Sequence, residues 1–280
     1  MTLALVLGGG GVAGIAWHTG VLAGLAGAGA DPTGADLVVG TSAGSTVAAQ
    51  LADGHPIDDL YRRQVDPATL ATELTPPVTV AELLGRLAPI YSAPVDPAER
   101  RRLLGTLALD TVTVPEDVRR AAIAARLVGH DWPERPVLIP VVDATSGARR
   151  VLDRHSGVAL VDAVAASCAV PGVWPPVTIG GVRYIDGGVW SLANADLAAG
   201  HDRVLVLAPI VDPTLADELA GLGTGVRVEV VQPDAPSRAA FGTDVLDPAN
   251  REPSARAGLA QGQAEADRVR ALLGAGPSGA

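Results

Sequence analysis

The sequence predicts an α/β fold in three layers, α/β/α, around a mainly parallel central sheet. Short apolar runs that end at glycine alternate with apolar helical segments, and two such strand–turn–helix units fit into the first 54 residues. The chain has 280 residues, 48% of them hydrophobic, which is enough for a sizeable core. Aromatic residues make up only 3%, so this core is expected to be aliphatic.

The N-terminal part of the chain contains the clearest pattern. Residues 2–7 form a short apolar run stopped by glycines, which is typical of a central parallel strand. Residues 17–25 follow with no polar face and predict a buried helix. A second strand is predicted over residues 36–39 and a second helix over residues 42–51. Successive units of this kind indicate a parallel sheet with right-handed crossovers.

The middle of the chain, residues 57 to about 127, has no clear strand pattern. Proline-punctuated helices are predicted there, around residues 80–87, 97–107 and 115–127, as a helical excursion that could act as a lid. Further strands are predicted over residues 136–142, 149–152, 182–185, 203–207 and 226–231, with helices over 159–168 and 253–273. No repeat or interdomain linker interrupts this order, so we predict a single domain over residues 1–273, followed by a disordered tail over residues 274–280.

The composition excludes several classes of chemistry. All 21 basic residues are arginine, so a Schiff-base lysine, a Ser–Lys dyad and a P-loop lysine are ruled out. One cysteine and five histidines argue against a bound metal, and no cofactor is expected. The formal net charge of −10 disfavours nucleic acid and electrostatic docking on anionic lipid.

The N-terminal segment is apolar but does not read as a targeting signal. No charged residue occurs in residues 1–30, so a positive n-region is lacking, and the glycines of residues 8–11 interrupt the apolar run. The same interruption argues against a membrane-spanning helix. We therefore predict a cytoplasmic location, which a single cysteine also suits.

The first chemical motif is G-T-S-A-G at residues 40–44, at a predicted strand-to-helix junction. Gly40 and Gly44 allow a sharp turn that would expose the Ser42 hydroxyl at a helix N-terminus. The helix dipole there favours negative charge on a reacting oxygen. Ser42 could instead be a simple helix N-cap, but its place at the junction favours a nucleophile.

The second motif is the glycine run after the first predicted strand. Gly9, Gly11 and Gly14 match the dinucleotide-binding spacing G-x-G-x-x-G. That fingerprint also requires an acidic residue at the end of the second strand, where this chain has V-G-T. Backbone amides beside a nucleophile can instead form an oxyanion hole, and a tight structural turn is compatible with either role.

A serine nucleophile needs a base. The histidine that follows residue 186 is His201, which precedes a predicted buried strand and is expected at the wrong end of the sheet. Asp186, in Y-I-D-G-G, closes a predicted strand, where partial desolvation would raise its pKa and make it a usable general base. Asp-Gly is also a common turn signal, so a purely structural role stays open.

Together, the three motifs resemble the patatin-like phospholipase family over most of the chain. The resemblance implies a patatin-like acyl hydrolase in which Ser42 is the nucleophile, Asp186 its base, and the amides of Gly9, Gly10 and Gly11 the oxyanion hole. The remaining motif glycines would be Gly14, Gly40, Gly44, Gly187 and Gly188. The implied partner is a lipid or small ester, with transient peripheral membrane contact and no metal or cofactor.

One position departs from the family pattern. Many members carry a basic residue just before the last glycine of the first motif, where this chain has Ala13. Since no arginine precedes Arg62, any positive charge near the oxyanion must come from a distant segment. Two other functions stay open: a non-catalytic interaction protein with the patatin fold, and a nucleotide-binding module that uses the glycine-rich turn.

Overall fold

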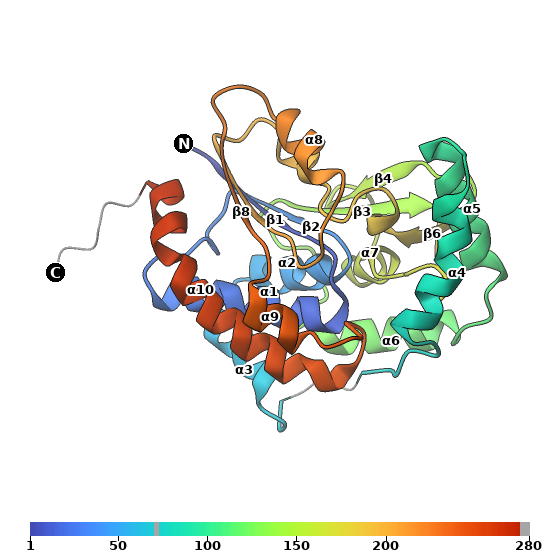
Figure 1. Cartoon of the computed structure of the whole chain (residues 1–280), viewed down its shortest axis with the longest axis horizontal. Helices are drawn as coiled ribbons and strands as arrows, with labels where there is room; N and C mark the ends of the chain where they lie inside the picture. Colours follow the sequence, from blue (N-terminus) through green and yellow to red (C-terminus); the bar gives the residue numbers. More distant parts are fainter. Residues whose placement is uncertain (70–72, 275–280) are drawn as a thin grey trace.

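The computed structural model describes residues 1–69 and 73–274, and it contains an eight-stranded sheet flanked by helices (Figure 1). The strands are β1 (Leu3–Leu7), β2 (Leu37–Gly40), β3 (Val137–Asp143), β4 (Arg149–Leu152), β5 (Val177–Ile179), β6 (Val182–Asp186), β7 (Arg203–Leu207) and β8 (Arg227–Val231). Their order is β5-β6-β3-β2-β1-β7-β8, with β4 paired to β3. The five strands from β3 to β8 in this order pair in parallel, whereas β4, β5 and β6 join by antiparallel pairing.

The helices cover both faces of this sheet. They are α1 (Gly11–Gly27), α2 (Ala43–Ala52), α3 (Ile57–Val65), α4 (Val80–Ser92), α5 (Pro97–Asp110), α6 (Glu116–Arg126), α7 (Leu160–Ser167), α8 (Leu215–Ala220), α9 (Ala235–Ala240) and α10 (Arg251–Leu273), with short 3-10 helices η1 (Gly187–Val189), η2 (Ala195–Ala198) and η3 (Pro248–Asn250). Leu3, Leu5 and Leu7 join the core that includes α1, whereas Ala4 and Val6 join a second core with η2 and α8. Burial on both sides of β1 confirms the predicted three layers.

The predicted elements form close to their expected places, and the differences have physical reasons. Helix α1 begins at Gly11 rather than residue 17, because the glycine run itself turns into the helix. Helix α4 continues through Pro89 to Ser92 instead of ending at residue 87; the carbonyl of Gly85, which loses its helical donor, lies at an exposed position. Strand β5 and helices α3, α8 and α9 were not predicted; each is only 3 to 9 residues long.

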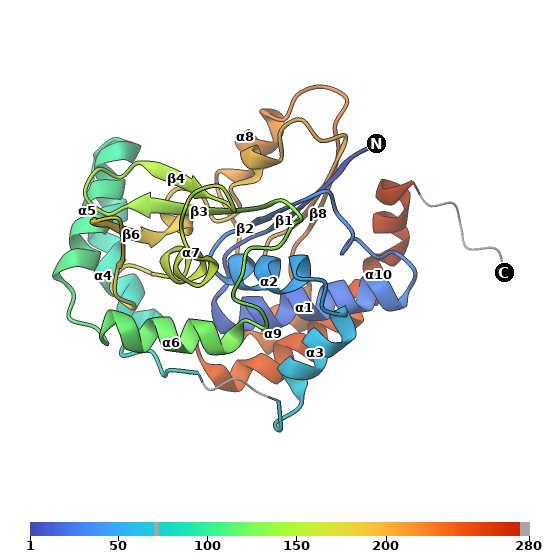
Figure 2. The same cartoon turned by 180° about the vertical axis from the view of Figure 1, so that it is seen from behind.

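The segment expected to lack strands, residues 57–127, contains α3, α4, α5 and α6. Helices α4 and α5 lie together beside the β6 end of the sheet (Figure 2). No helix in residues 1–69 or 73–274 combines the length and the apolar character needed to cross a membrane. The predicted tail lies outside the described residues except for Gly274, which caps α10 in the left-handed conformation.

Helices α1 and α10 pack against each other through glycines. A Cβ at Gly20 or Gly24 of α1 would overlap a carbonyl oxygen of α10. A Cβ at Gly262 of α10 would likewise overlap the carbonyl oxygen of Val21, and one at Gly258 would lie 2.6 Å from that of Trp17. The backbones of α1 and α10 are therefore in direct contact, which only glycine permits at these positions, and this contact fixes α1 against α10.

Replacing Gly24 with alanine is expected to lower the free energy of unfolding by about 1–3 kcal/mol, because the added methyl group must force the two helices apart. The matched control is Gly27→Ala at the end of the same helix, where nothing lies within 4 Å of the added Cβ. This control should stabilise the protein by less than about 1 kcal/mol. Urea unfolding measures both; equal stability of the two variants would contradict the tight glycine contact.

Candidate active site

Ser42 occupies a strained turn between β2 and α2. Its backbone has φ 53° and ψ −117°, and among the described non-glycine residues only Ser42 and Asn194 have positive φ. A Cβ at Gly40 would lie 2.6 Å from the carbonyl oxygen of Gly44, and one at Gly44 would overlap that of Leu7. Both glycines of the motif are thus required by the turn, as its spacing predicted.

Buried side chains hold this turn in place. The Ser42 amide donates to Ser167 Oγ at 3.0 Å, and Ser167 Oγ donates to the Pro140 carbonyl at 2.9 Å. The Ser42 carbonyl accepts from Ser45 Oγ at 2.7 Å and from the Cys168 thiol at 3.2 Å. The backbone of Ser42 is therefore fully engaged, and its side chain is left to face the cavity described below. Nothing in the sequence pattern distinguished Ser167 as its anchor.

Asp186 ends β6 and faces the same site. Its Oδ1 accepts the Gly188 amide at 2.7 Å, whereas its buried Oδ2 has no hydrogen-bond partner within the described parts of the chain. Burial raises the pKa of Asp186 to about 7, against the opposing effects of the Ser42 side chain and the Gly188 amide. The Ser42 hydroxyl is thus near enough to affect this carboxyl, although no Ser42–Asp186 hydrogen bond meets normal geometry. Such bonds often tighten only when substrate is bound.

The Asp186 turn also depends on its glycines. A Cβ at Gly187 would overlap the carbonyl oxygen of Pro140 in β3, and one at Gly188 would lie 3.0 Å from Asp186 Oδ1. The two glycines let the chain pass close to β3 while the Gly188 amide reaches back to the carboxylate. The turn is therefore built around the aspartate.

A cavity of about 390 Å³ brings the predicted residues together. Residues from three separate segments form one of its walls: Gly9, Gly10, Gly11, Ser42, Asp186 and Gly188. Most of the remaining wall is apolar, with side chains that include Leu83, Leu84, Leu87, Leu104, Val170 and Leu246. The cavity therefore combines a compact polar centre with an apolar chamber.

The glycine-rich turn contributes Gly9, Gly10 and Gly11 to the lining of this cavity, and two of these three amides have no partner within the described residues. The Gly9 amide donates to the Leu192 carbonyl at 2.8 Å and is already in use. The amides of Gly10 and Gly11 form no hydrogen bond within the described residues, and both lie at the N-terminus of α1. Gly11 has φ +64°, and a Cβ at Gly10 would lie 2.7 Å from Pro209 Cβ. Gly14 donates to the Gly10 carbonyl at 2.8 Å and so closes the first helical turn.

Asn194 links the two halves of the site, although no sequence pattern singled it out. Its side chain is fully buried, and its backbone is left-handed with φ 52°. Asn194 Nδ2 lies 3.1 Å from Thr41 Oγ1, 3.4 Å from the Gly187 carbonyl and 2.6 Å from the Ser191 carbonyl. One amide group therefore joins the residue before Ser42 to the residue after Asp186.

A family comparison matches this arrangement. The model of the family described as "Patatin-like phospholipase" matches residues 5–199, well over half of the chain. The chain belongs to the patatin-like phospholipase family. Membership confirms the resemblance inferred from the three motifs.

Two solved structures share similarity with this patatin-like chain. VipD from Legionella pneumophila is 14% identical with a TM-score of 0.45, and the match covers 95% of this chain and 66% of VipD. The type III effector protein ExoU is 20% identical with a TM-score of 0.43, and the match covers 96% of this chain and 53% of ExoU. The patatin-like chain thus spans about two thirds and about half of these proteins. No curated protein sequence matches it.

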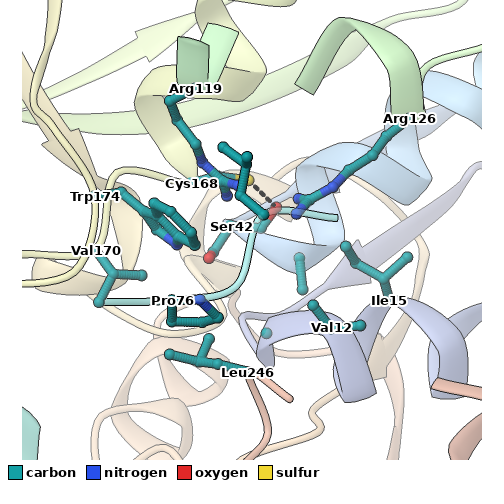
Figure 3. Close-up of a pocket in the computed structure, with 13 residues that line it drawn as sticks. Val12, Ile15, Ser42, Pro76, Arg119, Arg126, Cys168, Val170, Trp174 and Leu246 are labelled. Atoms are coloured by element: carbon teal, nitrogen blue, oxygen red, sulfur yellow. Dashed lines mark hydrogen bonds between the residues drawn. The ribbon is translucent and has the colours of Figure 1, made fainter. Parts of the chain in front are cut away.

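A second, smaller cavity of about 30 Å³ lies beside Ser42 of the patatin-like site (Figure 3). Arg119 and Arg126 extend into this region from α6, together with Trp174 and Cys168. Positive charge near Ser42 therefore does come from a distant segment, as the absence of a basic residue at position 13 required.

Other chemistry-bearing residues of the patatin-like chain lie elsewhere. His201 precedes β7, and its Nδ1 lies 3.1 Å from the Ala198 carbonyl. Because β2, β1 and β7 are parallel, this start of β7 is at the opposite sheet edge from Ser42, which follows the end of β2. Within residues 1–69 and 73–274, no group of three or more His, Cys, Asp or Glu side chains could hold a metal ion.

Proposed function

We propose that this chain is a serine acyl hydrolase of carboxylic esters, a lipid acyl hydrolase or esterase of the phospholipase A type. Ser42 would be the nucleophile and Asp186 its base. One observation carries the proposal: Ser42, the buried Asp186 carboxyl and the amides of Gly10 and Gly11 line a single apolar cavity. Membership of the patatin-like phospholipase family supports the same reading.

The reaction would begin with deprotonated Asp186. Its carboxylate takes the proton from Ser42 Oγ as this oxygen attacks the ester carbonyl, and the amides of Gly10 and Gly11 stabilise the resulting oxyanion. Asp186 then passes the proton to the leaving alcohol, which yields an acyl-enzyme. Asp186 then takes a proton from a water molecule, which attacks the acyl-enzyme; the proton passes to the departing Ser42 Oγ, and the acid is released. Gly9, expected as a third donor, would instead position the turn, because its amide is bonded to Leu192.

The apolar chamber would hold the acyl chain. Leu83, Leu84 and Leu87 bring α4 into its wall, so we propose that the excursion over residues 57–127 serves as a lid within one catalytic domain, residues 1–273. Leu84 and Tyr91 line the chamber yet are 59% and 56% exposed. These side chains suit a transient contact with a neutral or zwitterionic lipid surface, since the net charge of −10 disfavours anionic lipid. A cytoplasmic location stays a prediction.

An alkyl fluorophosphonate probe tests the proposal. We expect the probe to form a covalent bond to Ser42 Oγ with one label per chain, because an activated serine attacks phosphorus as it attacks a carbonyl. Peptide mass spectrometry locates the label. Ser42→Ala should not be labelled, whereas Ser92→Ala, at an exposed serine of α4, should label like wild type.

Absence of labelling at Ser42 in folded wild-type protein would sink the enzyme proposal and favour a non-catalytic interaction protein. A thermal shift with NAD or ATP would instead favour a nucleotide-binding module. Neither result depends on knowing the physiological ester.

A further inference from the structure

The small cavity beside Ser42 is distinct from the acyl chamber. The two cavities share Gly11, Ser42, Val170 and Leu246, so they meet at the nucleophile. The small one has a volume of about 30 Å³, and a buried water needs roughly 10–15 Å³ on this scale. It is therefore the size of a small polar group. An ester bound at Ser42 with its acyl chain in the large chamber leaves this second space for its alcohol part.

The charged side chains that line the small cavity are Arg119 and Arg126, and their pairing with carboxylates is incomplete. Arg126 donates to the Glu73 carboxylate from Nε, at 2.9 Å to Oε1 and 3.0 Å to Oε2, and also from Nη2. Arg251 Nη2 also donates a hydrogen bond to Glu73 Oε1, at 2.5 Å. Glu73 thus pairs with Arg126, which lines the small cavity, and with Arg251, which lines a neighbouring cavity together with Glu73 and Arg126. Arg119 forms no ion pair within the described residues, so Glu73 and these three arginines together carry an excess of positive charge.

Arg119 is placed to receive an anion. Its side chain is 4% exposed, and its guanidinium lies 3.8 Å from the ring centre of Trp174. Stacking occupies the face of the guanidinium and leaves its edge available for hydrogen bonds. Nε and Nη1 are buried without a partner in the described parts of the chain. Burial, together with the charge of Arg126, lowers the pKa of Arg119 to about 10, so the group stays charged at neutral pH.

A buried cation without a partner is costly, and an anion that fills the site would offset that cost. We propose that the small cavity is an anion subsite in which Arg119 binds a phosphate or carboxylate on the alcohol part of the ester substrate. This inference rests on the proposed acyl hydrolase function and names its preferred substrates: esters whose leaving alcohol carries an oxyanion. Arg119 would then supply the charge that the first glycine motif lacks at Ala13.

Two matched substrate pairs test the subsite and distinguish the source of the anion. The first pair is 4-nitrophenyl hexanoate and 3-carboxy-4-nitrophenyl hexanoate, which differ by one carboxylate on the leaving group. The second is 1-oleoylglycerol and 1-oleoyl lysophosphatidic acid, which differ by one phosphate. The measured quantity is the ratio of kcat/KM for the anionic ester to that for the neutral one. A response confined to one pair identifies the carboxylate or the lipid phosphate as the anion.

Arg119→Gln should lower this ratio by about 10- to 100-fold, the range expected when a charge-assisted hydrogen bond is lost. Arg119→Lys should restore part of it, because the charge returns without the planar fork. The matched control is Arg120→Gln, the next residue of α6, whose exposed side chain pairs with Asp162. This control should leave the ratio unchanged. Thermal unfolding of each variant shows that it is folded.

Binding to the Ser42→Ala protein gives a readout independent of hydrolysis. Hexyl phosphate, followed by isothermal titration, should bind this protein and lose about 10- to 100-fold in affinity when Arg119→Gln is added. If wild type hydrolyses both members of a pair and Arg119→Gln leaves their ratio unchanged, the subsite is wrong and the hydrolase stands. If no ester is hydrolysed and Ser42 is not labelled, the hydrolase is wrong, and hexyl phosphate binding alone decides the subsite.

Discussion

Asp186→Asn is expected to lower kcat for ester hydrolysis by about 10²- to 10⁴-fold, the range typical of losing a general base. Asparagine has nearly the same shape as aspartate and can still accept the Gly188 amide, but it cannot take the Ser42 proton. Ser42→Ala should lose more, up to about 10⁶-fold, because the acyl-enzyme cannot form. Steady-state hydrolysis of 4-nitrophenyl esters measures both variants.

The double variant gives a sharper result than either single one. Residues that act as one unit are non-additive, so Ser42→Ala with Asp186→Asn should be no slower than Ser42→Ala alone. Asp143→Asn serves as control, since Asp143 also ends a strand and accepts amides of the following turn, at 2.8 and 3.2 Å. Full activity of Asp186→Asn, together with loss of activity in Ser42→Ala, would show that Asp186 is not the base and would favour His201 instead.

The same substitution should make the protein more stable above pH 7. Burial raises the pKa of Asp186 from 3.8 to about 7, so the folded state favours the protonated carboxyl. The stability associated with this proton is fully present below pH 3.8 and is lost as the pH rises through about 7. At 1.36 kcal/mol per pKa unit, the loss amounts to about 4 kcal/mol. The Asp186→Asn variant has no ionisable group at this position, so it should not lose this stability as the pH rises.

Urea unfolding of wild type and Asp186→Asn between pH 4 and pH 8 measures this effect. The difference in unfolding free energy should grow with pH in favour of Asp186→Asn and level off above pH 7. Asp143→Asn should show the opposite sign, because hydrogen bonds from Thr145 and Ser146 outweigh burial and lower the pKa of Asp143. Parallel pH profiles for wild type and Asp186→Asn would contradict an aspartate that is costly to ionise.

The fold and the polar centre were readable from the sequence, because both depend on local patterns. Glycines two residues before and after Ser42 specify a tight turn, because a side chain at Gly40 would clash with α2 and one at Gly44 would clash with the backbone of β1. The hydrogen bond of the Gly9 amide could not be predicted, because its acceptor, the Leu192 carbonyl, lies in a loop far along the chain. Asn194, Ser167 and Arg119 were missed for the same reason. Each acts through tertiary contacts, and no local spacing marks it.

The glycine contact between α1 and α10 has a consequence for how the protein transmits force. The family match ends at residue 199, whereas α10 begins at Arg251. Helix α10 nevertheless packs against α1, whose N-terminus carries the Gly10 and Gly11 amides. At these glycines the backbones of α1 and α10 are in direct contact, with no side chain between them, so little space remains for one helix to move relative to the other. A displacement of α10 is therefore expected to move α1 as well, and with it the Gly10 and Gly11 amides at its N-terminus.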